Sequence, residues 1–103
     1  MRRSYSQAKI NRIVNTTSIV GDQYNLLIFF ELTKFGEKSF NELKRMTQIN
    51  AVTLTRKLRF LEKEKLIQKR YSGKEVIYSL TPKADKLKTV IEGISTLIEK
   101  EKL

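Results

Sequence analysis

The order of apolar and polar residues predicts a mainly helical chain with one β-hairpin in its second half. Apolar side chains recur at helical spacing over residues 5–19, and Gly21 ends this first helix. Residues 23–35 are apolar on nearly every face and stand between Asp22, which suits an N-cap, and Gly36, which suits a helix end. Because a helix that is apolar all round is a buried one, this run is predicted to be the central core element.

Two short amphipathic segments come next. Ser39 and Glu42 stand three residues apart, which is the signature of a capping box at the start of a helix. After a short break, Asn50 suits the N-cap of a second helix, whose leucines form one narrow stripe. Two short helices joined by a tight turn predict a helix-turn-helix over about residues 39–65.

The hydrophobic period then changes from that of a helix to that of a strand. Two alternating runs flank a Ser-Gly-Lys turn, which predicts a β-hairpin over about residues 67–80. Thr81 is expected to cap a last helix, over about residues 82–101, with Pro82 at its first position, where a missing N–H costs nothing.

Length and composition narrow the class of protein. At 103 residues and 12.1 kDa the chain fits one domain, residues 1–103, and no apolar run approaches the roughly 18 residues that span a bilayer. Residues 1–3 lead into polar sequence rather than a signal-peptide core, so we expect a soluble, cytoplasmic protein without membrane association. There is no Cys and no His, and the Lys and Glu residues form no catalytic constellation. We therefore expect no catalytic residues, no metal site and no cofactor.

The distribution of charge points to nucleic acid. The net charge is +10, of which residues 1–12 contribute +4 and residues 40–74 contribute +7. Residues 13–39 carry −1 and residues 75–103 are neutral. A basic surface kept for solubility would spread its charge evenly, whereas a nucleic-acid footprint concentrates it.

The second helix of the helix-turn-helix has a basic outer face, with Val52, Arg56 and Arg59 opposite its leucine stripe. Arg56 suits guanine, while Val52 and Thr53 suit thymine methyl groups. An ordinary solvated face would also carry Lys and Arg, but a hairpin with its own basic residues follows directly, which is the winged-helix order. The predicted DNA-binding residues are Ser39, Lys44, Arg45, Asn50, Val52, Thr53, Thr55, Arg56, Lys57, Arg59, Lys69, Arg70 and Lys74.

The stretch from Ile19 to Thr81 resembles the HxlR-type winged-helix transcriptional regulators, relatives of the MarR group. The matching pieces are IVGDQYNLLIFFEL, SFNELKRM, INAVTLTRKLRFLEKEKLI and VIYSLTPKA. The resemblance implies a homodimer, built from the first and last helices, that binds operator DNA. Some members of that family sense oxidants through a cysteine in the first helix. Here Asn11 stands near that position, which excludes thiol sensing.

The last helix carries an apolar seam at heptad spacing, which predicts a helix–helix interface. In a domain this small the seam is covered either by the body of its own domain or by a second subunit, and a two-fold dimer also matches palindromic DNA. The predicted dimer-interface residues are Ile10, Ile13, Val14, Leu87, Val90, Ile91, Ile94, Leu97 and Ile98.

The resulting hypothesis is a winged helix-turn-helix with additional N- and C-terminal dimerisation helices. It acts as a homodimeric transcriptional regulator on a palindromic operator in double-stranded DNA. The alternative is a winged-helix module that binds RNA or another protein without operator specificity. The sequence does not identify the operator or an effector ligand.

Overall fold

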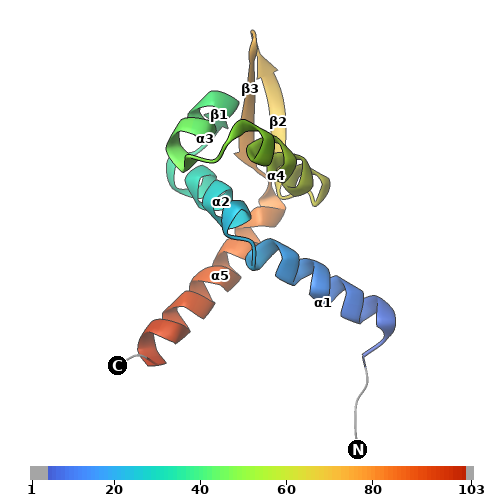
Figure 1. The fold of residues 1–103 in the computed structure, drawn as a ribbon. Coiled ribbons are helices and arrows are strands. Elements are labelled where there is room, and N and C mark those ends of the chain that lie inside the picture. The colour runs from blue at the N-terminus through green and yellow to red at the C-terminus, as the bar shows by residue number, and fades with distance from the viewer. Residues whose placement is uncertain (1–4, 102–103) are drawn as a thin grey trace, which may run out of the picture.

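The computed structural model describes residues 5–101, which form five helices and three strands (Figure 1). In chain order the elements are α1 (Gln7–Val20), α2 (Gln23–Phe35), β1 (Lys38–Ser39), α3 (Phe40–Thr47), α4 (Ala51–Lys63), β2 (Ile67–Ser72), β3 (Glu75–Leu80) and α5 (Pro82–Glu101). The predicted fold class, mainly helical with a small β-hairpin, is confirmed, and the helices lie close to their expected bounds. No helix in this part of the chain is long and apolar enough to cross a bilayer.

Local signals in the sequence set the ends of α2. The Asp22 carboxylate accepts hydrogen bonds from the backbone N–H groups of Tyr24 and Asn25, at 2.9 and 3.0 Å, so it caps the helix as predicted. The helix ends at Gly36, whose φ of 75° lies in the left-handed region that glycine adopts without strain.

The core lies between α2, α3, α4 and the base of the hairpin. The predicted leucine stripe of α4 (Leu54, Leu58, Leu61) is fully buried, and each such side chain stabilises the fold by about 1.5–3 kcal/mol. The buried apolar residues are Ile28, Phe29, Leu32, Leu43, Ile49, Leu54, Leu58, Leu61, Leu66, Ile67, Tyr78 and Ala84.

The sheet contains one strand that the sequence did not reveal. Its antiparallel strands have the order β1-β3-β2, with Lys38 opposite Tyr78 and Ser39 opposite Ile77. A two-residue strand has no alternation to detect, and it pairs with residues far along the chain.

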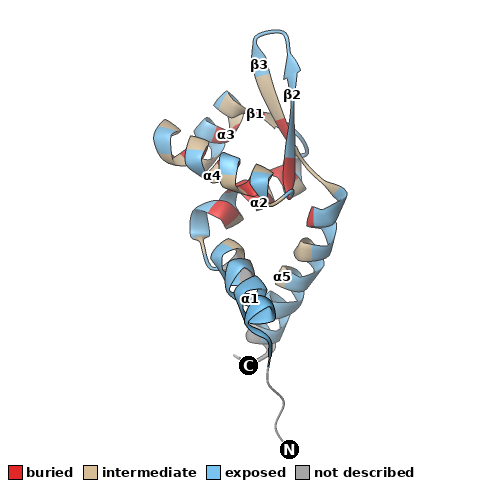
Figure 2. Cartoon of the chain, turned by 90° about the vertical axis from the view of Figure 1, so that its right-hand side faces the viewer, coloured by how far each residue is buried: buried red, intermediate tan, exposed pale blue. Residues whose placement is uncertain are grey.

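The hairpin itself has the predicted extent. It runs from the pair Ile67–Leu80 to the pair Ser72–Glu75, and the turn contains a glycine with a φ of 62°. Past Ile67 every residue of β2 is exposed. The hairpin therefore projects from the body as a wing (Figures 1 and 2).

The prediction that residues 23–35 are buried on all sides is wrong for a single chain. One face of α2, with Ile28 and Leu32, lies in the core, but Leu27 on the other face is 47% exposed. Helices α3 and α4 and the sheet cover only the inner face, because α1 and α5 leave the body in other directions (Figure 1). The outer apolar face has no cover within the described chain.

Helices α1 and α5 extend from the body as two separate legs (Figures 1 and 2). The Cα radius of gyration is 15.8 Å, compared with about 13 Å for a compact domain of this length. Thr81 precedes α5 as predicted, but its hydroxyl donates a hydrogen bond to the Lys65 carbonyl at 2.6 Å. That bond fixes the start of α5 to the turn between α4 and β2.

Candidate nucleic-acid interface

Three local features fix the orientation of α3 and α4. The Ser39 hydroxyl accepts from the Glu42 N–H at 3.1 Å and the Glu42 carboxylate accepts from the Ser39 N–H at 2.9 Å, which is the predicted capping box. The bond from the Ser39 backbone N–H also lowers the pKa of Glu42. Gln48, with a φ of 63°, turns the chain, and Asn50 caps α4 by accepting from the Thr53 N–H at 2.9 Å.

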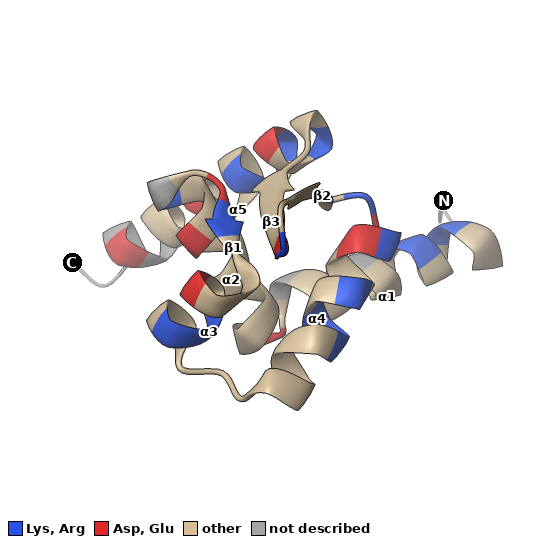
Figure 3. Ribbon diagram, turned by 90° about the horizontal axis from the view of Figure 1, so that it is seen from above, with Lys and Arg blue, Asp and Glu red and all other residues tan. Residues whose placement is uncertain are grey.

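Helix α4 presents a face of mixed apolar and basic character to solvent. Val52 is 76% exposed, and Arg56 and Arg59 are exposed on the same side of the helix. With Ala51 and Thr55 they line a shallow hollow of about 370 Å³. A guanidinium can bond both acceptors on the major-groove edge of guanine, and a valine methyl can contact the methyl of thymine. The view along the wing shows the basic bands of α4 and α3 (Figure 3).

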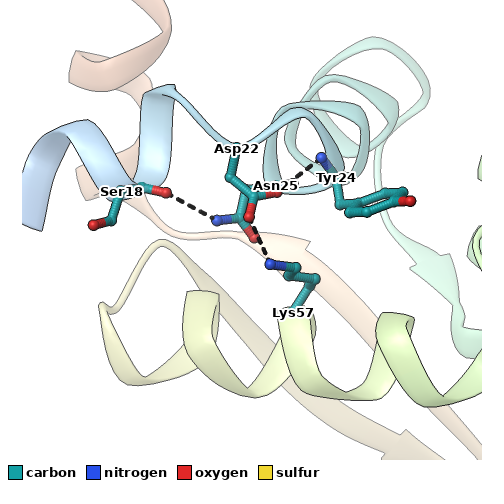
Figure 4. A network of polar contacts seen from close by, with 5 residues as sticks. All are labelled: Ser18, Asp22, Tyr24, Asn25 and Lys57. Atoms are coloured by element: carbon teal, nitrogen blue, oxygen red, sulfur yellow. Dashed lines mark hydrogen bonds and ion pairs between the residues drawn. The ribbon is translucent and has the colours of Figure 1, made fainter.

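The structure places Lys57 apart from this face. Its ammonium lies 2.5 Å from the Asp22 carboxylate and 6.0 Å from the centre of the Tyr24 ring (Figure 4). Lys57 is thus held against the corner between α1 and α2, half-buried. Lys57 is among the predicted DNA-binding residues, because nothing local in the sequence reveals a partner 35 positions away.

The Asp22 carboxylate therefore caps α2 and also pairs with α4. Partial burial would by itself raise its pKa, but hydrogen bonds from Lys57 and from the N–H groups of Asn25 and Tyr24 outweigh this, so the pKa is lowered below 3.8. A lowered pKa means that the stabilisation is present at neutral pH and is lost as the pH falls through the folded-state value.

Replacing Asp22 with alanine is expected to reduce the free energy of unfolding at pH 7 by about 1–2 kcal/mol, since the cap is lost. The deficit should shrink at pH 3, where protonation weakens the same contacts in the wild type. Urea denaturation at both pH values measures the loss in free energy of unfolding. Asp22→Asn, which keeps a capping oxygen, is the matched control. Equal deficits at the two pH values would contradict this account of Asp22.

The basic residues of the wing differ in their surroundings. Lys69 lies 3.6 Å from the Glu62 carboxylate, and Arg70 lies 2.6 Å from that of Glu37. Both ion pairs are partly exposed, so each contributes no more than about 1 kcal/mol and phosphate can compete for the cation. Lys74 is exposed at the turn of the wing and lines a hollow beside the start of α3.

Tyr71 on the wing is a surface residue that sequence analysis did not single out. Its ring is 71% exposed on β2, two residues beyond Lys69. Alternation places Tyr71 on the same face as Ile67, which is buried. The length of the hairpin could have indicated that Tyr71 is exposed. The strand face that is buried at the base of the hairpin becomes exposed where the hairpin extends beyond the body.

The remaining predicted contact residues lie on α3 or α4, or immediately before one of these helices. Ser39 is buried in its capping box, whereas Lys44 and Arg45 are exposed on α3 and Asn50 at the start of α4. Thr53 and Thr55 are half-buried on α4. The basic residues at positions 2 and 3 lie outside the described residues. Among residues 5–101, no His, Cys, Asp or Glu side chains gather in a group that could hold a metal ion.

The predicted dimer residues fall into two groups. Leu87 and Ile91 are half-buried against the core of their own chain. Exposed apolar side chains continue along both legs, and the side chain of Ile98 lies outside the described residues. The exposed members of the set are Ile10, Ile13, Val14, Val90, Ile94 and Leu97.

Comparisons with known proteins agree with this geometry. The model of the HxlR-like helix-turn-helix family matches residues 19–102. The reduced form of the transcriptional regulator YodB from B. subtilis is 26% identical, with a TM-score of 0.75 over 82% of this chain and 86% of that one. The transcriptional repressor BigR from Xylella fastidiosa is 26% identical, with a TM-score of 0.70 over 85% and 90%. A protein assigned to the MarR family in Porphyromonas gingivalis W83 is 27% identical, with a TM-score of 0.71 over 93% and 94%.

Proposed function

Because the chain belongs to the HxlR-like helix-turn-helix family of transcriptional regulators, we propose that it binds a palindromic operator in double-stranded DNA as a homodimer. In this proposal residues 1–103 form one winged-helix unit that acts in the cytoplasm. Each subunit places α4 in the major groove of one half-site, and its wing lies along the neighbouring backbone.

The outer face of α4 carries this proposal. Val52, Arg56 and Arg59 combine an apolar surface with two guanidinium groups on the outer face of a helix whose inner face is buried in the core. Lysines and arginines alone would attract any polyanion, but a highly exposed valine one turn before Arg56 is suited to a base edge. We assign base contacts to Val52 and Arg56, and phosphate contacts to Arg59 and Lys74.

Helices α1 and α5 support the proposal of a homodimer. Several of their apolar side chains are exposed along one chain, and the chain is more extended than a compact domain of its length. A two-fold pair would cover these surfaces and set the distance between the two copies of α4, as recognition of a palindrome requires.

Two substitutions distinguish base reading from general attraction. Arg56→Ala should weaken binding to an operator selected from random duplexes by about 1–3 kcal/mol and affect a scrambled duplex much less. Lys74→Ala should weaken both duplexes by similar factors and lower the salt slope by about one per contact removed. Fluorescence anisotropy with the two labelled duplexes measures all four affinities.

Equal losses on both duplexes for Arg56→Ala would mean that α4 does not read bases at this position. Tight binding to structured RNA without binding to any duplex would favour the alternative, a winged-helix RNA-binding module. In either case circular dichroism of the variants checks that the fold is intact, which is expected because both side chains are exposed.

A further inference from the structure

The outer face of α2 forms an open apolar groove. Leu26, Leu27 and Phe30 supply its apolar surface, and the volume of the groove is about 470 Å³. Its remaining lining residues are Gln23, Glu31 and Lys34. The sequence of α2 has the all-round apolar character of a buried helix, yet its own chain buries only the inner side. A second protein surface is the cover that this pattern requires.

Glu31 indicates which chemical group the surface that fills the groove should have. Its Oε2 atom is buried at the edge of the groove, and no described residue donates a hydrogen bond to it. A buried carboxylate oxygen without a donor is unfavourable, and the native partners of such oxygens are N–H groups or cations. The surface that fills the groove should therefore bring a basic group to Glu31.

Helix α1 has the complementary character. Arg12, Asn15 and Ile19 line a hollow whose other walls are the first half of α5 and the turn after α4 in the same chain. The exposed Ile10, Ile13 and Val14 project from the opposite side of the helix, away from that hollow. Lys9 flanks this apolar stripe, and α1 contains no acidic residue. The Lys9 ammonium lies 4.9 Å from the centre of the exposed Tyr5 ring, a contact that a carboxylate on another molecule can replace. Helix α1 thus has an exposed apolar stripe that is bordered by a cation and by no acid.

The exposed area of the chain is large enough to form a stable dimer. The accessible surface is 7721 Å², compared with roughly 6,000 Å² for a compact monomer of 12.1 kDa. The excess per chain is of the order that obligate homodimers bury, about 1,000 Å² or more on each side. This area is therefore sufficient for a second copy of this chain to be the occupant.

We propose that α1 of a second copy docks in the α2 groove, with its Lys9 ammonium on the Glu31 carboxylate, and that the contact is repeated across the two-fold axis. This inference rests on the proposed homodimer and adds the α2 groove to its interface. Helix α5 carries acidic and basic residues alike, and its heptad seam is suited to packing against α5 of the second copy. That leaves α1 for the groove.

The absence of cysteine from the chain permits a direct test. Ile13→Cys and Leu27→Cys are prepared as separate proteins, mixed, allowed to exchange subunits and oxidised gently. Because each chain has one thiol, a bond between positions 13 and 27 can only join two chains. We expect this link as the main mixed product on a non-reducing gel, identified by mass spectrometry of the joined peptides.

The control mixture pairs Leu27→Cys with Ile94→Cys on α5. A dominant link between positions 27 and 94 would overturn the proposal, because α5 would then occupy the groove. A wild-type dimer by light scattering without a 13–27 link would also overturn it, while leaving the homodimer itself intact. A wild-type monomer at micromolar concentration would instead remove the homodimer and the groove contact together.

The ion pair has a test of its own. Glu31→Gln and Lys9→Met should each weaken dimerisation by about thirtyfold, and the double variant should be little weaker than either single one. Sedimentation equilibrium gives the three dissociation constants. Independent, multiplicative losses would show that Lys9 and Glu31 do not meet.

Discussion

Raising the salt concentration from about 50 to 200 mM is expected to weaken duplex binding by roughly a thousandfold or more. Each phosphate neutralised releases a condensed counterion, so log affinity falls with log salt with a slope of about −0.9 per contact. The exposed cations of α3, α4 and the wing allow a dimer roughly 6–10 such contacts. They include Lys44, Arg45, Arg56, Arg59 and Lys74, together with Lys69 and Arg70 where phosphate replaces their carboxylate partners.

Anisotropy titrations of one labelled duplex at four or five salt concentrations give the slope. Val52→Ala is the matched control, because it alters the same face without removing a charge and should leave the slope unchanged. Lys57→Met should also leave the slope unchanged if Lys57 stays paired with Asp22. A flat response with every duplex tried would remove the claim of DNA binding.

The second large effect concerns the dimer. Replacing Ile94 and Leu97 with glutamate should convert the protein to a folded monomer, because burying the new carboxylates unpaired costs several kcal/mol. These residues are 50% and 61% exposed in the single chain, so the cost falls on association rather than on folding. Operator affinity should fall with dimerisation, since one half-site then binds without the other.

Light scattering and thermal unfolding separate the two quantities, namely the mass of the particle and the stability of each chain. Ile91 is a poorer choice of site, because it is half-buried against its own core and its loss would also weaken the fold. Thr96→Glu, at an exposed position on the opposite side of α5 from the seam, is the matched control and should remain dimeric. Dimers persisting in the doubly charged variant would exclude α5 from the interface.

Features coded locally could be predicted from the sequence. Asp22, Ser39 and Asn50 each cap a helix through backbone groups two or three residues away, so the residue types and their spacing suffice. The leucine stripe of α4 likewise follows from the period of the helix. These signals placed the helix-turn-helix and the exposed face of α4 correctly.

Features that depend on distant parts of the chain could not be predicted. The pairing of Lys57 with Asp22 and of Arg70 with Glu37 joins residues more than 30 positions apart. Charge patterning shows that such residues are basic but not which way they point. The exposure of the outer face of α2 could not be predicted for a related reason. The sequence of an apolar helix has the same pattern whether its own chain or another chain buries it.

The position of β2 at the edge of the sheet has a consequence for aggregation. In the part of the chain that the structure describes, no strand pairs with its outer N–H and C=O groups, because the strand order is β1-β3-β2. An exposed edge of this kind can pair with the same edge of another molecule, and charged residues on the strand oppose that pairing. Lys69 and Arg70 lie on this edge. Substitutions that neutralise them therefore remove a barrier to strand-to-strand association as well as two cations.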